Sequence, residues 1–408
     1  MSKSSSSSTS ASDSAPIPAS QASAPSHAAG SEPPGGKRAV VLCGGGITGA
    51  MYELGALAAM DDYLDATSQP RPGGSGLSST SFDIYVGISA GSFVATMLCA
   101  GISPRRLARA VLGDPADRYL VPHQRTDLFK FEPLRATRIG LTLGGVALRS
   151  LYRVLSGRIS PGDIPSELLA ATPGGVLSLK PYARFLRRLI SRQGLPARLS
   201  AMPKELFIPA NDLDGGHRVI FGGQGSGELA DVHIADAICA SSAIPLVFEP
   251  VRIGDRDYVD GGTGKADHVD VALKRGAKLV LVINPMVPIA HDPAYSSLPG
   301  PAARLSQRGL LTVYDQTMRM SIKARLHQGL RRWAAEYPDA TILLLEPDEA
   351  DSEMFLQNPM NFDARVQILR YGYQSAVQQL RARSGMFDLM CRRHGLSGDI
   401  QRLKKVWP

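Results

Sequence analysis

Residues 82–94 read FDIYVGISAGSFV, and this stretch decides the fold. Phe82 to Val86 is a short run rich in β-branched and aromatic side chains, which is typical of a β-strand. A turn with two glycines follows, and apolar side chains then recur at helical spacing, at Ala90, Phe93, Val94, Met97 and Leu98. The sequence therefore predicts a strand, a sharp turn and a helix in direct succession.

The same arrangement occurs once earlier in the chain. Ala39 to Cys43 is a continuous apolar run, as expected of a strand covered on both faces, and it leads into Gly44-Gly45-Gly46. Apolar side chains then follow helical spacing at Met51, Leu54, Leu57 and Ala58, and the acidic residues take the other face of this expected helix, at Glu53, Asp61 and Asp62. Two consecutive units of this kind predict a parallel α/β sheet.

Further strands are predicted at 205–209, 217–221, 251–254, 278–284 and 340–346. Residues 212–216, DLDGG, separate the first two and indicate a hairpin turn, so the predicted sheet is partly mixed. We expect a three-layer α/β/α sandwich with a mostly parallel central sheet.

Four regions are expected along the chain. Residues 1–36 are mostly Ser, Ala and Pro and should be a disordered tail, because they cannot bury enough apolar surface to offset chain entropy. An α/β domain is expected at 37–290, with a basic, mostly helical insertion at about 104–198. A mainly helical extension packed on the core is expected at 291–408.

Composition excludes several classes of protein. The 408 residues have a net charge of +8, with 44% hydrophobic and 20% charged, which rules out a fully disordered or fibrous chain. The four cysteines, at positions 43, 99, 239 and 391, lie far apart without metal-ligand spacing. We therefore expect no disulfide scaffold, no metal site and no cofactor.

Partners and location follow from charge and hydropathy. No segment has the ~20 apolar residues of a bilayer span, and the N-terminus lacks a signal-peptide pattern, so a cytoplasmic protein is expected. The sequence contains no zinc-finger, RNA-recognition or Lys-rich signature, so we expect no nucleic-acid partner. In the insertion, arginines such as Arg105, Arg106 and Arg109 alternate with large apolar residues, which fits either peripheral contact with an anionic membrane or a solvated helix face. Nothing in the sequence indicates an oligomeric state.

Gly87-x-Ser89-x-Gly91 lies between the predicted strand and helix, which is the context of a nucleophile elbow. Glycines flank the serine because the turn is so sharp that a Cβ would clash with the crossing backbone. The N-terminal N–H groups of the following helix favour negative charge developing at the serine oxygen. Ser89 is the candidate nucleophile.

Gly44 to Gly49, GGGITG, has two interpretations. It fits the local pattern of a dinucleotide-binding loop, and it also offers free backbone N–H groups to an oxyanion. A dinucleotide-binding fold has an acidic residue at the end of the next strand, whereas this chain has Ser89 there. We favour an oxyanion hole and keep a dinucleotide-binding protein as the alternative.

The base that would activate Ser89 is less obvious. His268 and His291 are weak candidates, since too few residues precede Ser89 for an ordinary α/β-hydrolase order. Asp260 follows a short predicted strand and precedes Gly261 and Gly262, so its carboxylate can be offered at the sheet edge, although an Asx-turn role is the competing interpretation.

Three motifs together resemble the patatin-like phospholipase family: the triple-glycine turn, G-x-S-x-G and D-G-G, with ASSAIP at 240–245 before the last. The resemblance spans about 37–288. It implies a Ser89–Asp260 dyad without a histidine, and an oxyanion hole from the amides of Gly44, Gly45 and Gly46, with motif glycines Gly49, Gly87, Gly91, Gly261 and Gly262. The implied activity is hydrolysis of phospholipids or other acyl lipids through an acyl-enzyme, as a phospholipase A or lysophospholipase.

Three positions depart from the family pattern. Thr48 occupies a place where members usually have Arg or Lys, and Ala266 and His268 replace an Asn and a Pro that commonly follow D-G-G. Losing the cation should weaken the field around the oxyanion or a substrate phosphate. A catalytically weak lipid-binding protein and an acyltransferase therefore remain as alternatives.

Overall fold

The computed structural model describes residues 36–64, 78–122, 124–129, 133–172, 174–223, 229–266, 268–290, 304–349 and 359–404. The tail predicted at 1–36 lies outside these residues except for Gly36, and so does the candidate base His291.

A mixed eight-stranded sheet forms the centre of the fold, as predicted. Its strand order is β10-β9-β1-β2-β4-β8-β7, and β5 pairs with β4 at the side of this path. The bounds are β1 (Lys37–Leu42), β2 (Ile84–Gly87), β4 (Glu205–Asp212), β5 (His217–Gly222), β7 (Val251–Ile253), β8 (Arg256–Asp260), β9 (Ala277–Ile283) and β10 (Thr341–Leu345). The first five strands in this order are parallel, whereas β5, β7 and β8 are antiparallel to their neighbours. A second, two-stranded sheet pairs β3 (Gly175–Leu177) with β6 (Leu246–Phe248).

The register of β1 and β2 brings the two glycine turns together. Leu42 pairs with Gly87, so both strands end at the same level of the sheet. Because parallel strands point the same way, the turn at Gly44 and the turn at Ser89 lie side by side at their carboxyl ends. This pairing positions the candidate site.

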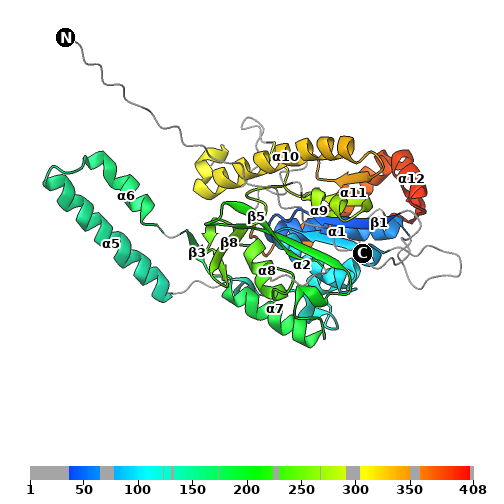
Figure 1. Ribbon diagram of the computed structural model, residues 1–408, viewed down its shortest axis with the longest axis horizontal. Helices are drawn as coiled ribbons and strands as arrows, with labels where there is room; N and C mark the ends of the chain where they lie inside the picture. The colour runs from blue at the N-terminus through cyan, green and yellow to red at the C-terminus, as the bar shows by residue number, and fades with distance from the viewer. Residues whose placement is uncertain are drawn as a thin grey trace, which may run out of the picture. The chain divides into compact units, whose positions relative to one another are not determined.

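Helices cover both faces of the sheet (Figure 1). One face carries α1 (Gly46–Tyr63), α2 (Ala90–Cys99), α3 (Pro104–Val111), α7 (Lys180–Arg192), α8 (Ile234–Ser241) and α11 (Arg365–Ala382), whose apolar residues share one core with Val40, Leu42 and Tyr85. The other face carries α9 (Val269–Lys274) and α10 (Leu310–Glu336), which pack on Ala39, Val41 and Val86. Alternate residues of each strand thus point into two cores, one on each face of the sheet, which gives the predicted three layers.

The acidic residues of α1 are buried and do not face solvent. Glu53, Asp61 and Asp62 are all buried, although they lie against different neighbours; α11 packs along one side of α1 and covers Asp62. Gly55 and Gly372 allow the close approach: a Cβ at Gly55 would come within 2.3 Å of the carbonyl oxygen of Leu369. The acidic groups find partners inside the protein, as Tyr373 donates to Asp62 at 2.8 Å and the Ser79 N–H donates to Asp61 at 2.7 Å.

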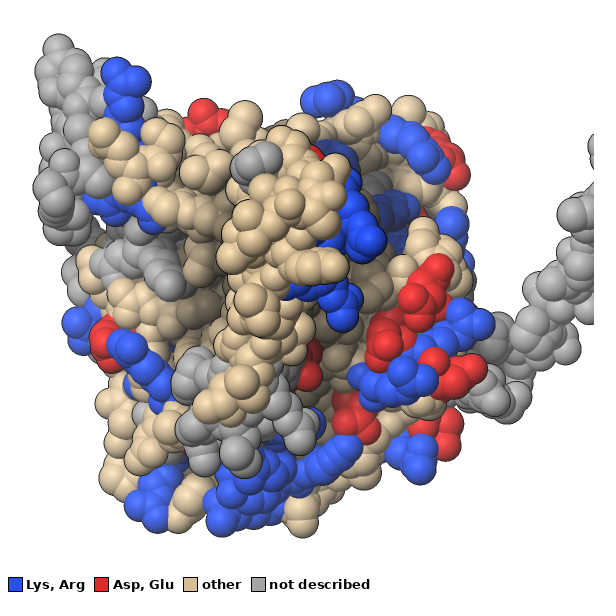
Figure 2. Space-filling view, turned by 90° about the vertical axis from the view of Figure 1, so that its left-hand side faces the viewer, with Lys and Arg blue, Asp and Glu red and all other residues tan. Residues whose placement is uncertain are grey.

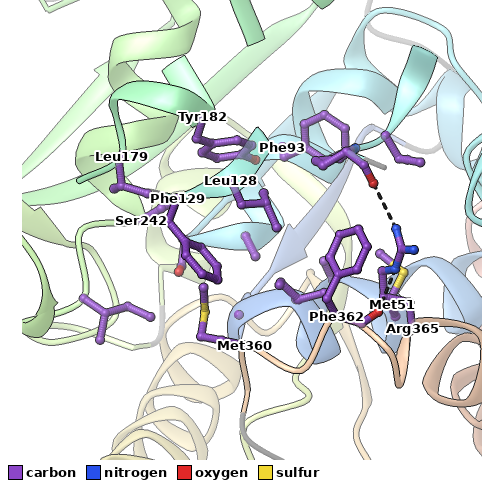
Figure 3. A pocket seen from close by; sticks show the side chains of 18 of the residues that line it. Met51, Phe93, Leu128, Phe129, Leu179, Tyr182, Ser242, Met360, Phe362 and Arg365 are labelled. Atoms are coloured by element: carbon purple, nitrogen blue, oxygen red, sulfur yellow. Dashed lines mark hydrogen bonds between the residues drawn. The ribbon is translucent and has the colours of Figure 1, made fainter. Parts of the chain in front are cut away.

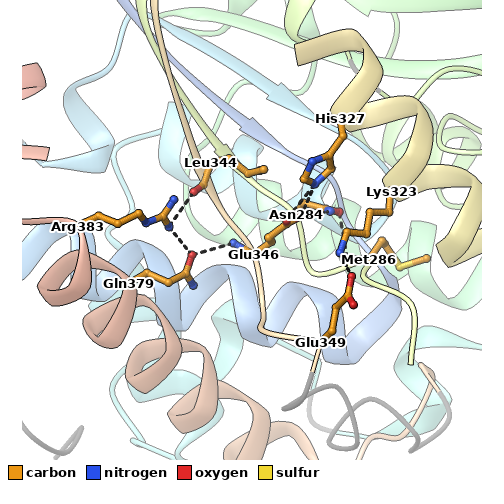
Figure 4. Close-up of polar contacts among 9 residues, drawn as sticks. All are labelled: Asn284, Met286, Lys323, His327, Leu344, Glu346, Glu349, Gln379 and Arg383. Carbon is orange, nitrogen blue, oxygen red and sulfur yellow. Dashed lines mark hydrogen bonds and ion pairs between the residues drawn. The ribbon is translucent and has the colours of Figure 1, made fainter. Parts of the chain in front are cut away.

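Polar contacts fasten the C-terminal helices to the end of the sheet (Figure 4). His327 of α10 contacts Glu346 at 2.9 Å, and Asn284, after β9, donates to the same carboxylate at 3.1 Å. The Asn284 side chain also accepts the backbone N–H of Met286 at 3.0 Å. Met286 lies against Gly45, so this network reaches the triple-glycine turn.

The stretch at 104–198 has two parts. α3 and α7 bury Leu107, Phe185 and Leu186 in the main core. The remaining helices are α4 (Arg125–Leu128), α5 (Pro133–Leu155) and α6 (Ile164–Ala170), and α5 packs on α6. No helix in the described ranges is long and apolar enough to cross a bilayer.

The arginines of α3 that were candidate membrane contacts are engaged by acids. Arg105 pairs with Asp62, and both Arg106 and Arg109 pair with Asp117 at 3.0 Å. Asp117 is buried, and the pKa of its carboxyl is lowered because hydrogen bonds and charge from these two arginines outweigh its burial. Neutralised in this way, the α3 arginines offer little net charge to a membrane.

Candidate active site

Ser89 sits on a strained elbow between β2 and α2. Its backbone has φ 52° and ψ −129°, a conformation that a residue with a side chain rarely adopts. A Cβ at Gly87 would lie 2.5 Å from the Cα of Ser92, and one at Gly91 would lie 2.8 Å from the carbonyl oxygen of Leu42. Only glycine fits at these two positions, and the turn directs Ser89 out of the strand at the start of the helix.

A second serine holds this elbow in place. The backbone N–H of Ser89 donates to the Ser241 hydroxyl at 2.9 Å, and that hydroxyl donates to the carbonyl oxygen of Pro209 at 2.6 Å. Ser241 is the last residue of α8 and is fully buried. The strained turn is thereby tied to β4.

Asp260 ends β8 next to the elbow. One carboxylate oxygen, Oδ1, accepts the Gly262 N–H at 2.8 Å, and the other, Oδ2, is buried without a hydrogen-bond partner in the described part of the chain. Burial raises the pKa of Asp260 to about 6, and the neighbouring Ser89 hydroxyl and the Gly262 N–H oppose this rise. The Ser89 and Asp260 side chains are therefore neighbours, and the carboxyl is a stronger base than an exposed aspartate.

The triple-glycine turn has three successive residues in the left-handed region: Gly44 at φ 77°, Gly45 at φ 109° and Gly46 at φ 69°. The Gly44 N–H is already used, since it donates to Oε1 of the buried Glu53 at 2.6 Å. This contact occupies the Gly44 amide, and the Gly45 and Gly46 amides are the remaining candidates for an oxyanion hole. Burial raises the pKa of the Glu53 carboxyl, against the opposing effect of this hydrogen bond.

His268 supports the D-G-G turn through a hydrogen bond to Gly261. Its Nε2 donates to the carbonyl oxygen of Gly261 at 3.2 Å, and its Nδ1 accepts from Arg218 at 3.4 Å. Burial and the Arg218 charge lower the pKa of His268 to about 3, so the ring is neutral at physiological pH. The weak histidine candidate is thus a backbone support.

Thr48, where the family usually has a cation, is completely buried. Its backbone N–H donates to the carbonyl oxygen of Pro359 at 3.2 Å, and a Cβ at Gly46 would come within 2.7 Å of the same oxygen. The C-terminal segment therefore lies directly against the glycine turn. A long cationic side chain at position 48 has no solvated place in this packing.

A largely apolar pocket opens beside Ser89 (Figure 3). Phe93, Leu179 and Tyr182 approach it from one side, and Met360 and Phe362 of the C-terminal segment approach from the opposite side. Its polar lining includes the Ser242 hydroxyl, which is buried without a partner among the described residues. The pocket offers a hydrocarbon chain contacts on several sides, next to the candidate nucleophile.

Arg365 closes one part of this pocket. It donates to the carbonyl oxygens of Phe362 at 2.8 Å and Pro122 at 2.9 Å. Since Pro122 precedes α4 and Arg365 begins α11, this side chain joins two distant parts of the chain that both line the pocket.

Several of these residues were not found by sequence reasoning. The sequence pattern places Glu53 only on the acidic face of its helix, and it shows Ser241 only as part of ASSAIP. No feature at 359–365 indicated a pocket wall. In the described ranges, no group of three or more His, Cys, Asp or Glu side chains could hold a metal ion.

Comparisons with known proteins give one family. The pattern described as patatin-like phospholipase matches residues 40–273, more than half of the chain. No curated protein matches significantly. Among solved structures, VipD from Legionella pneumophila is 13% identical, with 86% of this chain and 68% of that chain covered and a TM-score of 0.35. ExoU from the Pseudomonas aeruginosa type III secretion system, crystallised with SpcU, is 16% identical, with 88% and 63% covered and a TM-score of 0.27.

Proposed function

The chain belongs to the patatin-like phospholipase family, a family of lipid-hydrolysing enzymes, and we propose that it is a serine lipid acyl hydrolase of the phospholipase A or lysophospholipase type. Ser89 is the proposed nucleophile and Asp260 the proposed base. The observation that carries this proposal is the buried Asp260 carboxyl, which lies next to the Ser89 hydroxyl and has one oxygen without a partner among the described residues.

The first step is attack of the Ser89 Oγ on the carbonyl carbon of a lipid ester. Asp260 accepts the hydroxyl proton as the new C–O bond forms, and the carbonyl oxygen becomes an oxyanion. Collapse of this intermediate breaks the bond to the leaving alcohol, which takes the proton from Asp260 and leaves an acyl-enzyme. Water, deprotonated by the same carboxylate, then releases the fatty acid.

The proposed oxyanion hole is made by the Gly45 and Gly46 amides. Each preorganised amide of this kind can contribute roughly 3 kcal/mol to transition-state stabilisation. Glu53 supports the hole from behind, because it fixes the preceding amide of Gly44. The packing of Met286 and Pro359 against this turn keeps the glycines in their left-handed conformations.

The apolar pocket supports an acyl-lipid substrate. A fatty-acid chain would lie among Phe93, Phe129 and Met360, with its carbonyl carbon at Ser89. The same surroundings speak against the dinucleotide alternative. A pyrophosphate needs free amides and polar surroundings, whereas here the Gly44 amide is used and the buried Glu53 carboxyl lies behind it.

A panel of radiolabelled phospholipids, lysophospholipids and triacylglycerols tests the proposal. The wild-type chain should release fatty acid and react with a fluorophosphonate probe. Ser89→Ala should lose both activities, and Asp260→Asn should lose turnover by about three orders of magnitude or more. Ser191→Ala removes an exposed serine from α7 and is the matched control, expected to behave as wild type.

The results separate the alternatives. Absence of both hydrolysis and probe labelling from the wild type would point to a lipid-binding relative without catalysis. Acyl transfer to an added alcohol in preference to water would indicate an acyltransferase. Turnover by Asp260→Asn above about a tenth of wild type would disprove the dyad.

A further inference from the structure

α5 carries a stripe of exposed apolar side chains. Five large residues of this helix are between 48% and 79% exposed: Leu141, Leu148, Leu151, Tyr152 and Leu155. Their spacing of seven, three, one and three residues places them on one helix face. The opposite face contacts α6, since Ser150 is buried there and both Ser150 and Arg153 contact Glu167. The stripe is the side of the helix that α6 leaves uncovered.

The charged residues of α5 and of the turn that follows it are all basic. Residues 133–162 contain five arginines, at 135, 138, 149, 153 and 158, and no acidic residue. Arg149 and Arg158 are exposed and have no ion-pair partner in the described ranges. Figure 2 views the molecule from the side on which α5 and α6 lie in Figure 1, and it shows Lys and Arg beside and below a band of uncharged residues, with Asp and Glu among further basic residues to its right. The surface is apolar with a basic border.

The segment with α5 and α6 is connected directly to the pocket. Phe129 and Leu179 both line the pocket, and the chain between them, which includes α5 and α6, is one continuous segment. Phe129 packs against Phe248 with ring centroids 6.3 Å apart, and Leu177 of β3 pairs with the same Phe248. Both ends of this segment therefore pack at the rim of the pocket beside Ser89.

We propose that the exposed face of α5 docks on the surface of an anionic lipid bilayer and brings the pocket to the lipid. This inference rests on the proposed function, because the anchoring matters only if Ser89 acts on membrane lipids. Leucines and Tyr152 enter the boundary between headgroups and acyl chains, and Arg149 and Arg158 contact lipid phosphates. The helix lies in the plane of the interface.

A bilayer suits this face better than a second protein. Charge complementarity to phosphate is available at the exposed Arg149 and Arg158. A second copy of the chain would instead bring the same arginines together, and their mutual repulsion would oppose pairing through this face. The ion-paired arginines of α3 contribute no comparable surface.

Co-sedimentation with vesicles tests the proposal in the full-length Ser89→Ala chain, which cannot consume the lipid. Vesicles of equal parts phosphatidylcholine and phosphatidylglycerol should bind it. The triple variant Leu148→Ser, Tyr152→Ser, Leu155→Ser should bind at least about tenfold more weakly. The matched control Leu213→Ser, Leu310→Ser, Leu389→Ser removes side chains that are 52% to 70% exposed elsewhere, and it should bind within about twofold of its parent.

A second pair of variants separates charge from apolar insertion. Arg149→Gln with Arg158→Gln should weaken binding to the anionic vesicles about 10- to 30-fold and leave binding to pure phosphatidylcholine unchanged. Circular dichroism melting checks that each variant is folded. Equal binding by the α5 triple variant and its parent would overturn the proposal. So would a dimer in gel filtration that the triple variant dissociates, combined with no vesicle binding by the parent.

The outcome is independent of catalysis. If wild type hydrolyses no lipid but the Ser89→Ala chain binds vesicles through α5, the docking proposal is supported and the proposed function is contradicted. Wild type and the α5 triple variant can also be compared by the ratio of vesicle-lipid hydrolysis to hydrolysis of a soluble short-chain ester. If wild type hydrolyses vesicle lipid and the two ratios are equal, the docking proposal is contradicted and the proposed function is supported.

Discussion

The Ser241 hydroxyl accepts the backbone N–H of Ser89 at 2.9 Å, so a side chain more than 150 residues away in sequence fixes the strained turn of the candidate nucleophile. The backbone of Ser241 also serves the other half of the proposed dyad, because its carbonyl oxygen accepts the N–H of Gly261 at 3.3 Å. One residue thus sets the position of Ser89 relative to Asp260.

Replacing Ser241 by Ala should lower both activity and stability. The Ser89 N–H and the Pro209 carbonyl would lose their partner in a buried site, which costs about 1–3 kcal/mol. We expect a fall in kcat of about tenfold or more, with a smaller change in KM. Ser242→Ala, one residue later, is the control for stability: its hydroxyl has no partner among the described residues, and its loss should leave the melting temperature unchanged within a degree or two.

Activity should depend on the ionisation of Asp260. The carboxylate form is the base, and its pKa is raised to about 6 by burial. A pH profile of kcat/KM on a soluble ester should therefore be flat above pH 7 and fall about tenfold per unit below the pKa. A plateau extending down to pH 4 would show that Asp260 is not the group that limits proton transfer.

Asp260→Asn should be inactive and yet more stable than wild type at neutral pH. The pKa of Asp260 lies near 6 in the folded protein and near 3.8 in the unfolded chain, so its ionisation disfavours the folded state. This penalty of about 2–3 kcal/mol is fully present above pH 6 and disappears below the unfolded pKa. Urea unfolding at pH 8 and pH 3.5 measures it: the Asn variant should gain stability at the higher pH only.

Glu53 offers a matched pair of substitutions. Glu53→Gln retains an oxygen that can accept the Gly44 N–H, whereas Glu53→Met has a similar size and no acceptor. The Gln variant should keep kcat within a few-fold of wild type, and the Met variant should lose about 10- to 100-fold as the oxyanion turn loosens. Equal activities would mean that the hydrogen bond to Gly44 is dispensable.

His268 should matter for stability and not as a base. Its pKa is lowered to about 3 in the folded protein, so the unfolded chain binds a proton that the folded one does not as the pH falls below 6.5. Stability from this group is present above pH 6.5 and declines toward pH 3. His268→Gln keeps a donor for the Gly261 carbonyl oxygen and should retain at least about a tenth of wild-type turnover. A loss as deep as that of Ser89→Ala would restore a histidine mechanism.

Local sequence predicted the centre of the fold well. The run at Ala39–Cys43 is apolar on both faces, which is typical of a strand covered by two helical layers. The structure confirms the mixed sheet and three layers. The glycines at 87 and 91 indicated the sharp turn because their lack of a side chain has a local steric cause. The roles of Ser89 and Asp260 remain predictions.

Helical periodicity shows that two faces of α1 differ in polarity. It does not show which other segments of the chain pack on each face. Glu53, Asp61 and Asp62 are all buried, and each has a different partner: Gly44, Ser79 and Tyr373. The partner of Asp62 lies 311 residues away in the chain, so no window of local sequence contains it.

The sequence by itself determined the strand, the elbow and the glycine turn, because sterics between neighbouring residues dictate them. The tertiary structure decided which amides of that turn remain free, how strongly Asp260 holds a proton, and which residues wall the pocket. Those properties depend on burial and on contacts between segments such as 44–46, 241–260 and 359–365. Burial changes the free energy of charges and hydrogen bonds, and it exists only once the distant parts of the chain are packed together.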